Sequence, residues 1–425
     1  MDVNAAGAFY ENALEAAASG EALDIVKLLI EKGADVRGEE GGSALQAAAH
    51  EGALDIVKLL IAHGADVNTK GGVFGSALQA AVSRGALDIV ELLIENRVDV
   101  NATGNQDGSA LQVAAYRGQL DVVKLLIENK ANVNATGDWS ALQAAASQGE
   151  FDIVKLLVAH GADVNAKEGQ YGSALNAAAC VGKFDIVKLL IEKGADARGE
   201  EGGSALQAAA RGGALDIVKL LIENKADVNA TGGRYGSAFQ VAARQGQLDI
   251  VKLLIENGAD INTRGGRDAL RAAARGGGLD IVKQLVEKGA DARGEEGGSA
   301  LQVAARKGQL DIVKLLLEKG ADVNARGEEG KSALQAAASE GALDIAKLLI
   351  AHGADVNAIG EIFGSALQAA ATAHRGAFEI VKLLIECGAD VNATGGRDGS
   401  ALGAALRKGY SDIANLLVQH GASSG

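Results

Sequence analysis

Proline is missing from this sequence of 425 residues, and aromatic residues make up only 3% of it. Cysteine occurs twice, at Cys180 and Cys387. Two cysteines so far apart provide neither a disulfide framework nor the paired ligands of a zinc knuckle, so we expect a reducing, cytoplasmic (intracellular) location. Hydrophobic residues are 48% of the chain and are mainly Ala, Leu, Ile and Val. Any core is therefore built from small and aliphatic side chains.

The chain also lacks a basic excess and a long hydrophobic run. Its formal net charge is −14, which argues against a general nucleic-acid binder because neutralising phosphates requires a basic face. A local basic patch stays possible. No apolar segment reaches the length of a membrane span, and the N-terminus has no signal-peptide pattern. We therefore expect no nucleic-acid and no membrane partner.

What the sequence does contain is an internal repeat. The phrase Ser-Ala-Leu-Gln-Ala-Ala recurs with small variations in thirteen units, 31 or 33 residues apart except for the last, which follows after 35. Repeats of this period are typical of solenoids. The first alanines of the phrase are Ala13, Ala44, Ala77, Ala110, Ala141, Ala174, Ala205, Ala238, Ala269, Ala300, Ala333, Ala366 and Ala401. The units leave no room for a linker, so residues 1–425 are predicted to form one array.

Each unit begins with a helix that its own sequence caps. In the second unit, Ser43 precedes Ala44 to Ala49, and Gln46 stands three residues after the serine. Ser and Gln at this spacing form a capping box, which satisfies free N–H groups at the helix start. Nine of the thirteen units keep the pair. The alanines predict a slim first helix whose neighbours can approach closely, and Gly52 ends it.

A second helix follows in each unit. Ile56, Leu59 and Leu60 have the i, i+3, i+4 spacing of a buried stripe, and Asp55 near the start suits the helix dipole. Gly64 then ends the helix in the manner of a glycine in the left-handed region. One such unit cannot bury its apolar faces alone, so the units must stack. The expected fold is all-α, a curved and elongated helix–turn–helix repeat solenoid.

Three units depart from this ending. Ten units end the second helix with glycine, but Arg97, Lys130 and Lys225 occupy the corresponding position in the others. Either these residues adopt the left-handed conformation at a cost of about 1 kcal/mol, or the asparagine before each of them adopts it instead. These asparagines are Asn96, Asn129 and Asn224.

The period and architecture resemble those of the ankyrin repeat. The second half of a unit, such as Asp24 to Ile30 followed by Gly33 to Val36, matches that pattern closely, whereas Ser43 to Gln46 reads Ser-Ala-Leu-Gln in place of Thr-Pro-Leu-His. The Ala-Leu-Gln-Ala-Ala variant looks most like arrays attached to fungal NACHT-type receptors. The resemblance implies short hairpin finger loops, a concave face lined by fingers and first helices, and protein partners that dock there.

The ends of the array are irregular. Residues 1–5 read as the tail of an incomplete unit, which suggests a fragment of a longer array, and residues from about 398 to 425 form an irregular unit typical of a terminal cap. Distant blocks resemble one another more than neighbours do, as in the phrase RGEEGGSALQ that begins at Arg37, Arg198 and Arg293. This pattern favours duplication of multi-repeat segments, and an engineered or reconstructed array stays open.

No constellation in the sequence predicts catalysis, a cofactor or a metal. Gly330-Lys331-Ser332 ends like a phosphate-binding loop but lacks its first glycine, since Ala325 stands there. Cys180 has no nearby histidine to activate it. Four histidines share a helix-terminal position in separate units, where the dipole favours them: His63, His160, His352 and His420. Paired glutamates lie in solvated turns. We therefore expect no enzyme.

Two features point to a binding surface. Single aromatics are found in the predicted finger loops, and they either pack on the next finger or form a contact line for a partner. They are Phe74, Trp139, Tyr171, Tyr235 and Phe363. The end of the first helix is where units differ most, with Tyr116 in one unit and arginine in four successive others. These are Arg211, Arg244, Arg275 and Arg306.

The four arginines are predicted to form a ladder with rungs about 10 Å apart. Arg234, Arg264, Arg267 and Arg271 lie in or beside the neighbouring fingers, and Lys307 follows the last rung. In an acidic chain such a stripe would attract an acidic protein segment; alternatively, the arginines are solvated or pair with loop glutamates. The leading hypothesis is a monomeric protein-binding scaffold, such as the sensor arm of a larger receptor. A structural spacer or engineered scaffold without a partner is the alternative.

Overall fold

The computed structural model describes residues 3–4, 12–37, 44–70, 74–103, 108–167, 172–198, 204–232, 236–261, 264–293, 300–327, 330–360, 364–373, 377–396 and 399–423, with the backbone alone for 264–268 and 377. In these residues the chain forms pairs of short helices, one pair to each predicted repeat. The contacts between them divide the chain into unit 1, Met1–Ala226, and unit 2, Asp227–Gly425.

The first helix of each pair begins at or near the alanine that the repeat predicts. These helices are α1 (Ala13–Ser19), α3 (Ala44–Glu51), α5 (Ala77–Arg84), α7 (Ala110–Tyr116), α9 (Ala141–Gln148), α11 (Ala174–Cys180), α13 (Ala205–Gly212), α15 (Ala238–Gln245), α17 (Arg264–Gly276), α19 (Ala300–Arg306), α21 (Ala333–Glu340), α23 (Ala366–Thr372) and α25 (Ala401–Lys408). Only α17 begins clearly earlier, five residues before its alanine.

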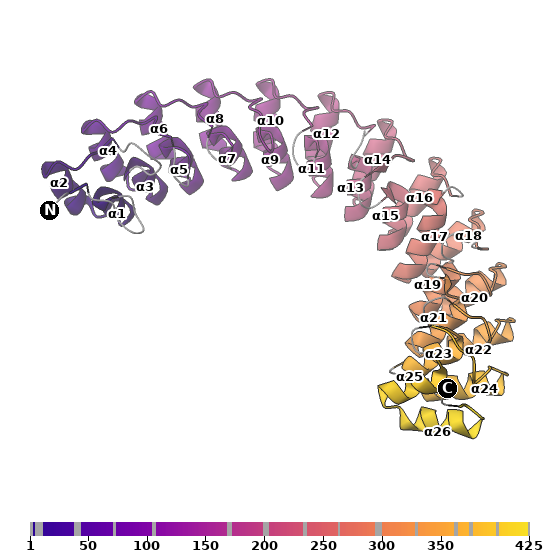
Figure 1. Ribbon diagram of the computed structural model, residues 1–425. Coiled ribbons are helices and arrows are strands. Elements are labelled where there is room, and N and C mark those ends of the chain that lie inside the picture. Colours follow the sequence, from indigo (N-terminus) through magenta and orange to yellow (C-terminus); the bar gives the residue numbers. More distant parts are fainter. Residues whose placement is uncertain are drawn as a thin grey trace. The chain divides into compact units, whose positions relative to one another are not determined.

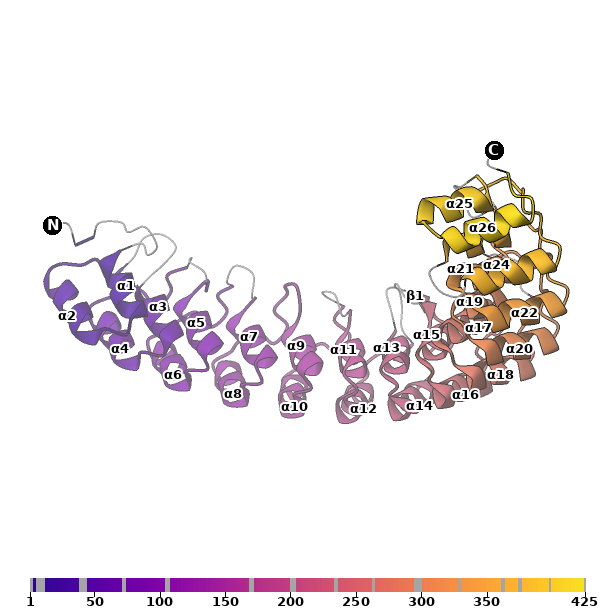
Figure 2. The ribbon, with the colours of Figure 1, turned by 90° about the horizontal axis from the view of Figure 1, so that it is seen from below.

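The second helix follows after a short turn. These helices are α2 (Leu23–Glu31), α4 (Leu54–Ala62), α6 (Leu87–Glu95), α8 (Leu120–Glu128), α10 (Phe151–Ala159), α12 (Phe184–Glu192), α14 (Leu215–Glu223), α16 (Leu248–Glu256), α18 (Leu279–Glu287), α20 (Leu310–Glu318), α22 (Leu343–Ala351), α24 (Ala377–Glu386) and α26 (Ser411–Gln419). Within each unit the first helices pack on one another in one layer, and the second helices form the other layer (Figures 1 and 2). The all-α repeat solenoid is confirmed.

Capping boxes start the first helices, as predicted. In α9 the Ser140 hydroxyl accepts a hydrogen bond from the Gln143 N–H, and Gln143 Oε1 accepts one from the Ser140 N–H. The same reciprocal pair starts α7, α13, α15, α21 and α23. At α5 the serine caps the helix without completing the box, because its hydroxyl donates to the Oε1 of Gln79. Ser43 and Ser299, which begin two more of the predicted boxes, lie outside the described residues.

The core lies between the two helix layers. Ala48 and Ala49 on α3 are fully buried, so the neighbouring first helices can approach closely. On α4 the structure buries Ile56 and Leu60 as predicted, but Leu59 is only half-buried. Val57 takes its place in the core. One of the three predicted stripe positions is therefore wrong, because α4 turns residues i, i+1 and i+4 toward the core instead of i, i+3 and i+4.

Hairpin fingers connect neighbouring pairs at four places in the described residues. Between α14 and α15, the strands β1 (Thr231–Gly232) and β2 (Gly236–Ser237) pair antiparallel. Isolated bridges join Thr103 to Ser109, Gly360 to Gly364 and Gly395 to Gly399 in three further fingers. In these four connections, the predicted finger loops are thus present as short two-stranded turns.

The three charged residues that replace glycine at the ends of the second helices also adopt the left-handed conformation. Arg97, Lys130 and Lys225 have φ values of 64°, 68° and 65°. The preceding asparagines stay at negative φ, and their side-chain amides donate to the carbonyl four residues earlier, as from Asn96 Nδ2 to Leu92 O at 2.8 Å. The alternative with a left-handed asparagine is therefore wrong, and the strain falls on the charged residue.

In six repeats, a glutamine links the repeat to the finger of the next. The Nε2 of Gln143 donates to Ala166 O at 3.3 Å and to Gly172 O at 2.7 Å, both in the following finger. The glutamine therefore caps its own helix through Oε1 and holds the neighbour through Nε2. The same link to the following finger is made by Gln46, Gln79, Gln112, Gln335 and Gln368.

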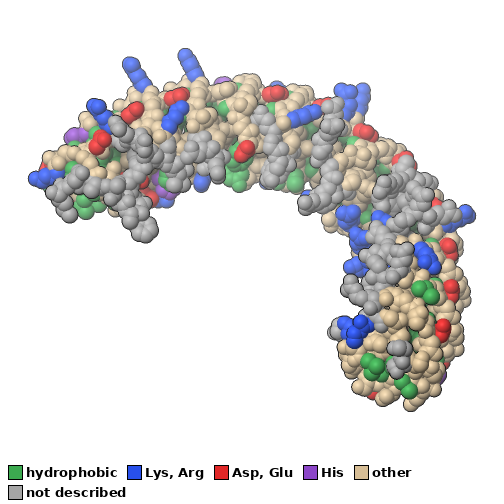
Figure 3. Space-filling view, viewed as in Figure 1, with side chains coloured by type: hydrophobic (Ala, Val, Ile, Leu, Met, Phe, Trp, Pro, Cys, Tyr) green, Lys and Arg blue, Asp and Glu red, His purple; other side chains and the backbone are tan. Residues whose placement is uncertain are grey.

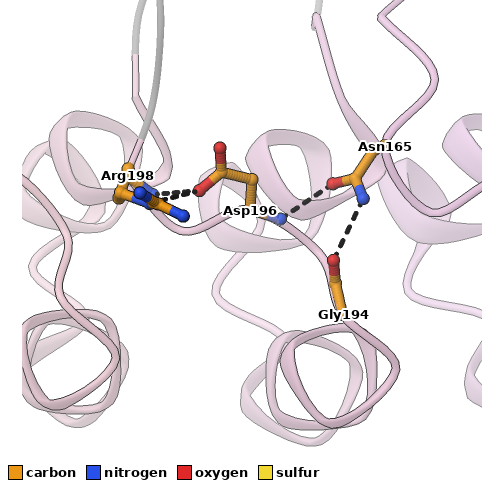
Figure 4. A network of polar contacts seen from close by, with 4 residues as sticks. All are labelled: Asn165, Gly194, Asp196 and Arg198. Carbon is orange, nitrogen blue, oxygen red and sulfur yellow. Dashed lines mark hydrogen bonds and ion pairs between the residues drawn. The ribbon is translucent and has the colours of Figure 1, made fainter.

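An asparagine makes a second link at the other end of the finger. Asn165 donates to Gly194 O at 3.0 Å and accepts from the Asp196 N–H at 2.8 Å (Figure 4). Arginine stands at this position in three repeats, and a guanidinium, which has no acceptor, cannot form both bonds. One of them, Arg198, pairs with Asp196 at 3.4 Å instead.

Candidate partner-binding surfaces

Three of the four predicted arginines lie on successive first helices of unit 2. Arg244, Arg275 and Arg306 occupy the same place near the C-terminal end of α15, α17 and α19, and each is exposed. The two residues before each arginine are buried alanines. They fix the orientation of the helix, so that the arginine side chain lies on its exposed face. We call these three residues the arginine row.

The packing of α15, α17 and α19 sets the spacing of the row. α17 packs directly on both α15 and α19. A Cβ placed on Gly276, next to Arg275, would lie 2.8 Å from the carbonyl oxygen of Arg244. The backbones of α15 and α17 therefore meet at the row itself, and only glycine permits this approach.

Among the residues that the structure describes, none forms an ion pair with Arg244, Arg275 or Arg306. Lys307, beside the last rung, is exposed and adds a further positive charge. The next first helix, α21, has Ser339 at the equivalent position, so the row ends there. Figure 3 shows Lys and Arg side chains gathered where the first helices of unit 2 lie.

The net charges of the two units differ. Residues 1–226 contain 19 Lys and Arg against 31 Asp and Glu, a net charge of −12, whereas residues 227–425 contain 22 against 24, a net charge of −2. The row therefore lies in the nearly neutral unit 2, whose acidic residues do not greatly outnumber its basic ones.

We do not count the remaining predicted basic residues in the row. Arg211 is exposed on α13 but belongs to unit 1, and it takes part in an interaction of its own. Arg271 is half-buried and also takes part in an interaction with another residue. Arg234 lies outside the described residues, as do the side chains of Arg264 and Arg267. Three of the four predicted rungs thus lie within unit 2, and the fourth, Arg211, stays a prediction.

Two finger aromatics pack against the first helix of the preceding repeat. Trp139 meets Tyr116 edge-on, with ring centroids 4.7 Å apart, and Phe74 stacks on His50 at 4.0 Å. Both contacts join a finger to the variable helix end rather than to the next finger. Tyr116 stays 44% exposed, so its ring is held in place yet accessible. Tyr171, Tyr235 and Phe363 lie outside the described residues.

Trp139 is also held through its backbone, because Gln112 Nε2 donates to its carbonyl oxygen. The pairing of His50 with Phe74 was not predicted. The available signal was that His50 and Tyr116 share one repeat position and that an aromatic residue stands in the following finger of both. Fixed rings of this kind have a low entropic cost of binding.

The other sequence candidates have structural roles. Ser332, after Gly330 and Lys331, caps α21. The Nδ1 atoms of His63, His352 and His420 lie 2.9 Å from the backbone oxygen four residues earlier, at the ends of their second helices. In the described ranges, no group of three or more His, Cys, Asp or Glu residues could hold a metal ion. No helix in those ranges is long and apolar enough to cross a membrane.

Comparison with known families accounts for nearly the whole chain. The family model described as ankyrin repeats (3 copies) matches residues 1–71, 78–168, 142–232, 175–265, 230–295 and 270–360, and the single ankyrin repeat model matches residues 365–396. No curated protein matches the sequence. Because these matches cover far more than half of the chain, it belongs to the ankyrin repeat family.

Proposed function

We propose that this chain is a non-catalytic protein-recognition scaffold whose partner lies across the first helices and fingers. Ankyrin repeats generally mediate protein–protein interaction. The observation that carries the proposal is the arginine row: three exposed arginines in an acidic chain, none of which forms an ion pair with another described residue. The partner segment that meets the row is acidic. In a larger receptor, the same surface would serve as the sensor arm.

Arginine suits this role because its planar guanidinium binds a carboxylate through two parallel hydrogen bonds. Such contacts are strongest where water is excluded, which a partner that covers the exposed row would achieve. The row also attracts an acidic segment before contact, so association should weaken as salt screens the charges.

The fixed aromatic pairs of unit 1 provide a second contact area of different chemistry. Tyr116 and Trp139 present rigid rings, and aromatic residues of this kind commonly anchor protein interfaces. We propose Tyr116, Trp139 and Phe74 as contact residues of unit 1. Tyr171, Tyr235 and Phe363 complete the proposed set from the sequence, as does Arg211.

A double charge reversal tests the proposal. The proteins that bind the wild-type chain are captured, and the affinity of the principal one is measured for Arg244→Glu with Arg275→Glu at two salt concentrations. The matched control is Lys283→Glu with Lys314→Glu, which makes the same charge change on exposed second-helix residues of the same region.

We expect the first pair to weaken binding at least tenfold and to reduce its salt dependence, with circular dichroism unchanged, and the control pair to have little effect. Equal affinities for all three proteins would remove the row from the interface. Failure of the wild-type chain to retain any specific protein would favour a structural spacer.

A further inference from the structure

We infer that the arginine row selects an extended, polyproline II-like segment with an acidic residue at every third position. This inference rests on the proposed function, because it specifies the partner that the same row would bind. It follows from the spacing of the row, from the conformations that a peptide can adopt, and from the point where the positive charge ends.

The spacing of the row is that of neighbouring first helices. Packed helices lie roughly 8–10 Å apart, and α17 packs directly on both α15 and α19. The close backbone approach between Gly276 and the carbonyl of Arg244 shows that α15 and α17 are in direct contact at the first two rungs. Because all three arginines occupy one repeat position, successive rungs are related by one helix spacing along the stack.

Peptide conformations differ in how often a side chain returns to the same face. A polyproline II segment has three residues per turn and rises about 3.1 Å per residue, so every third side chain points the same way, about 9 Å further on. In a β-strand, side chains on one face are about 7 Å apart. On a helix, neighbours on one face are about 5–6 Å apart. Of these three repeats, only that of polyproline II falls within the roughly 8–10 Å that separates packed helices.

The row also sets the length of the part of the segment that unit 2 binds. Beyond Arg306, the next first helix has the uncharged Ser339, followed by Glu340, which would repel a further carboxylate. Three rungs with three-residue steps correspond to a segment of about seven residues. The segment therefore has the form acidic-x-x-acidic-x-x-acidic, with residues such as proline or glutamine at x that favour the extended conformation and add no charge.

Fluorescence anisotropy with labelled peptides tests this register. Three peptides of identical composition contain three glutamates among proline, alanine and glutamine, at positions 1, 4 and 7, at positions 1, 3 and 5, or at positions 1, 5 and 9. Each is titrated with the full wild-type chain, with Arg275→Gln, with Arg244→Glu/Arg275→Glu and with Lys283→Glu/Lys314→Glu. Single-stranded DNA of similar length serves as a second polyanion.

We expect the peptide with glutamates at 1, 4 and 7 to bind at least tenfold more tightly than the other two. Arg275→Gln should reduce this preference to less than threefold, whereas the lysine pair should preserve it. Equal affinities for the three peptides, all weakened by the arginine variants, would overturn the register and leave the proposed acidic site intact.

Peptide binding that the arginine variants do not change, or no binding at all, would overturn both the register and the row as a partner site. Single-stranded DNA that binds as tightly as the best peptide would identify the row as a general polyanion surface and would also overturn the inference.

Discussion

The closest backbone approach at the arginine row predicts that one added methyl group will destabilise the chain. Gly276 ends α17 in a helical conformation, so alanine would be favourable there by about 0.5–1 kcal/mol if space were available. Its Cβ, however, would lie 2.8 Å from the carbonyl oxygen of Arg244. Backbone atoms must move to relieve this contact, and such overpacking costs about 1–3 kcal/mol. We therefore expect Gly276→Ala to reduce the free energy of unfolding by about 1 kcal/mol.

The same chain contains a matched control. Gly212 ends α13 at the equivalent repeat position, but its Cβ would lie 3.8 Å from the nearest atom, the carbonyl oxygen of Cys180, which is ordinary contact. Only the helix propensity should change, and Gly212→Ala should stabilise the chain by about 0.5–1 kcal/mol. Urea denaturation of both variants, followed by circular dichroism, measures the difference. A Gly276→Ala protein as stable as Gly212→Ala would refute the steric argument.

Three further predictions concern the links between repeats and the ends of the second helices, and all are measured by urea denaturation. Arg97→Gly and Lys130→Gly should each stabilise the chain by about 1 kcal/mol, because they remove a side chain from the left-handed region; lower midpoints in both would count against strain. Gln143→Glu should destabilise by about 2 kcal/mol, because a carboxylate cannot donate to the two carbonyl oxygens of the next finger, whereas the exposed Gln148→Glu should be nearly neutral. Arg37→Asn should add the missing asparagine link to the next repeat and stabilise by about 0.5–1.5 kcal/mol, and no gain would show that the neighbouring loop is not placed to receive it.

Much of the fold could be predicted because the signals are local. Ser140 and Gln143 lie three residues apart on one helix turn, so their capping box follows from spacing alone. The burial of Ile56 and Leu60 follows from helical periodicity in the same way. The error at Leu59 arose because i+1 and i+3 positions both border such a stripe, and the neighbouring helix decides between them.

The parts that could not be predicted depend on contacts between repeats. Gln143 was predicted only as a cap, because its second role requires knowing where the carbonyls of the next finger lie. The stacking of His50 on Phe74 likewise joins residues of two repeats. The close approach at Gly276 was hidden because glycine at that position reads simply as the end of a helix.

Hydrogen exchange of the chain with and without its captured partner tests the central claim most directly. We predict that the partner protects backbone amides at the C-terminal ends of α15, α17 and α19, where the arginine row lies, and that Arg244→Glu with Arg275→Glu abolishes this protection. Protection confined to α16, α18 and α20, with the first helices exchanging as in the free chain, would place the partner on the opposite layer and contradict the account.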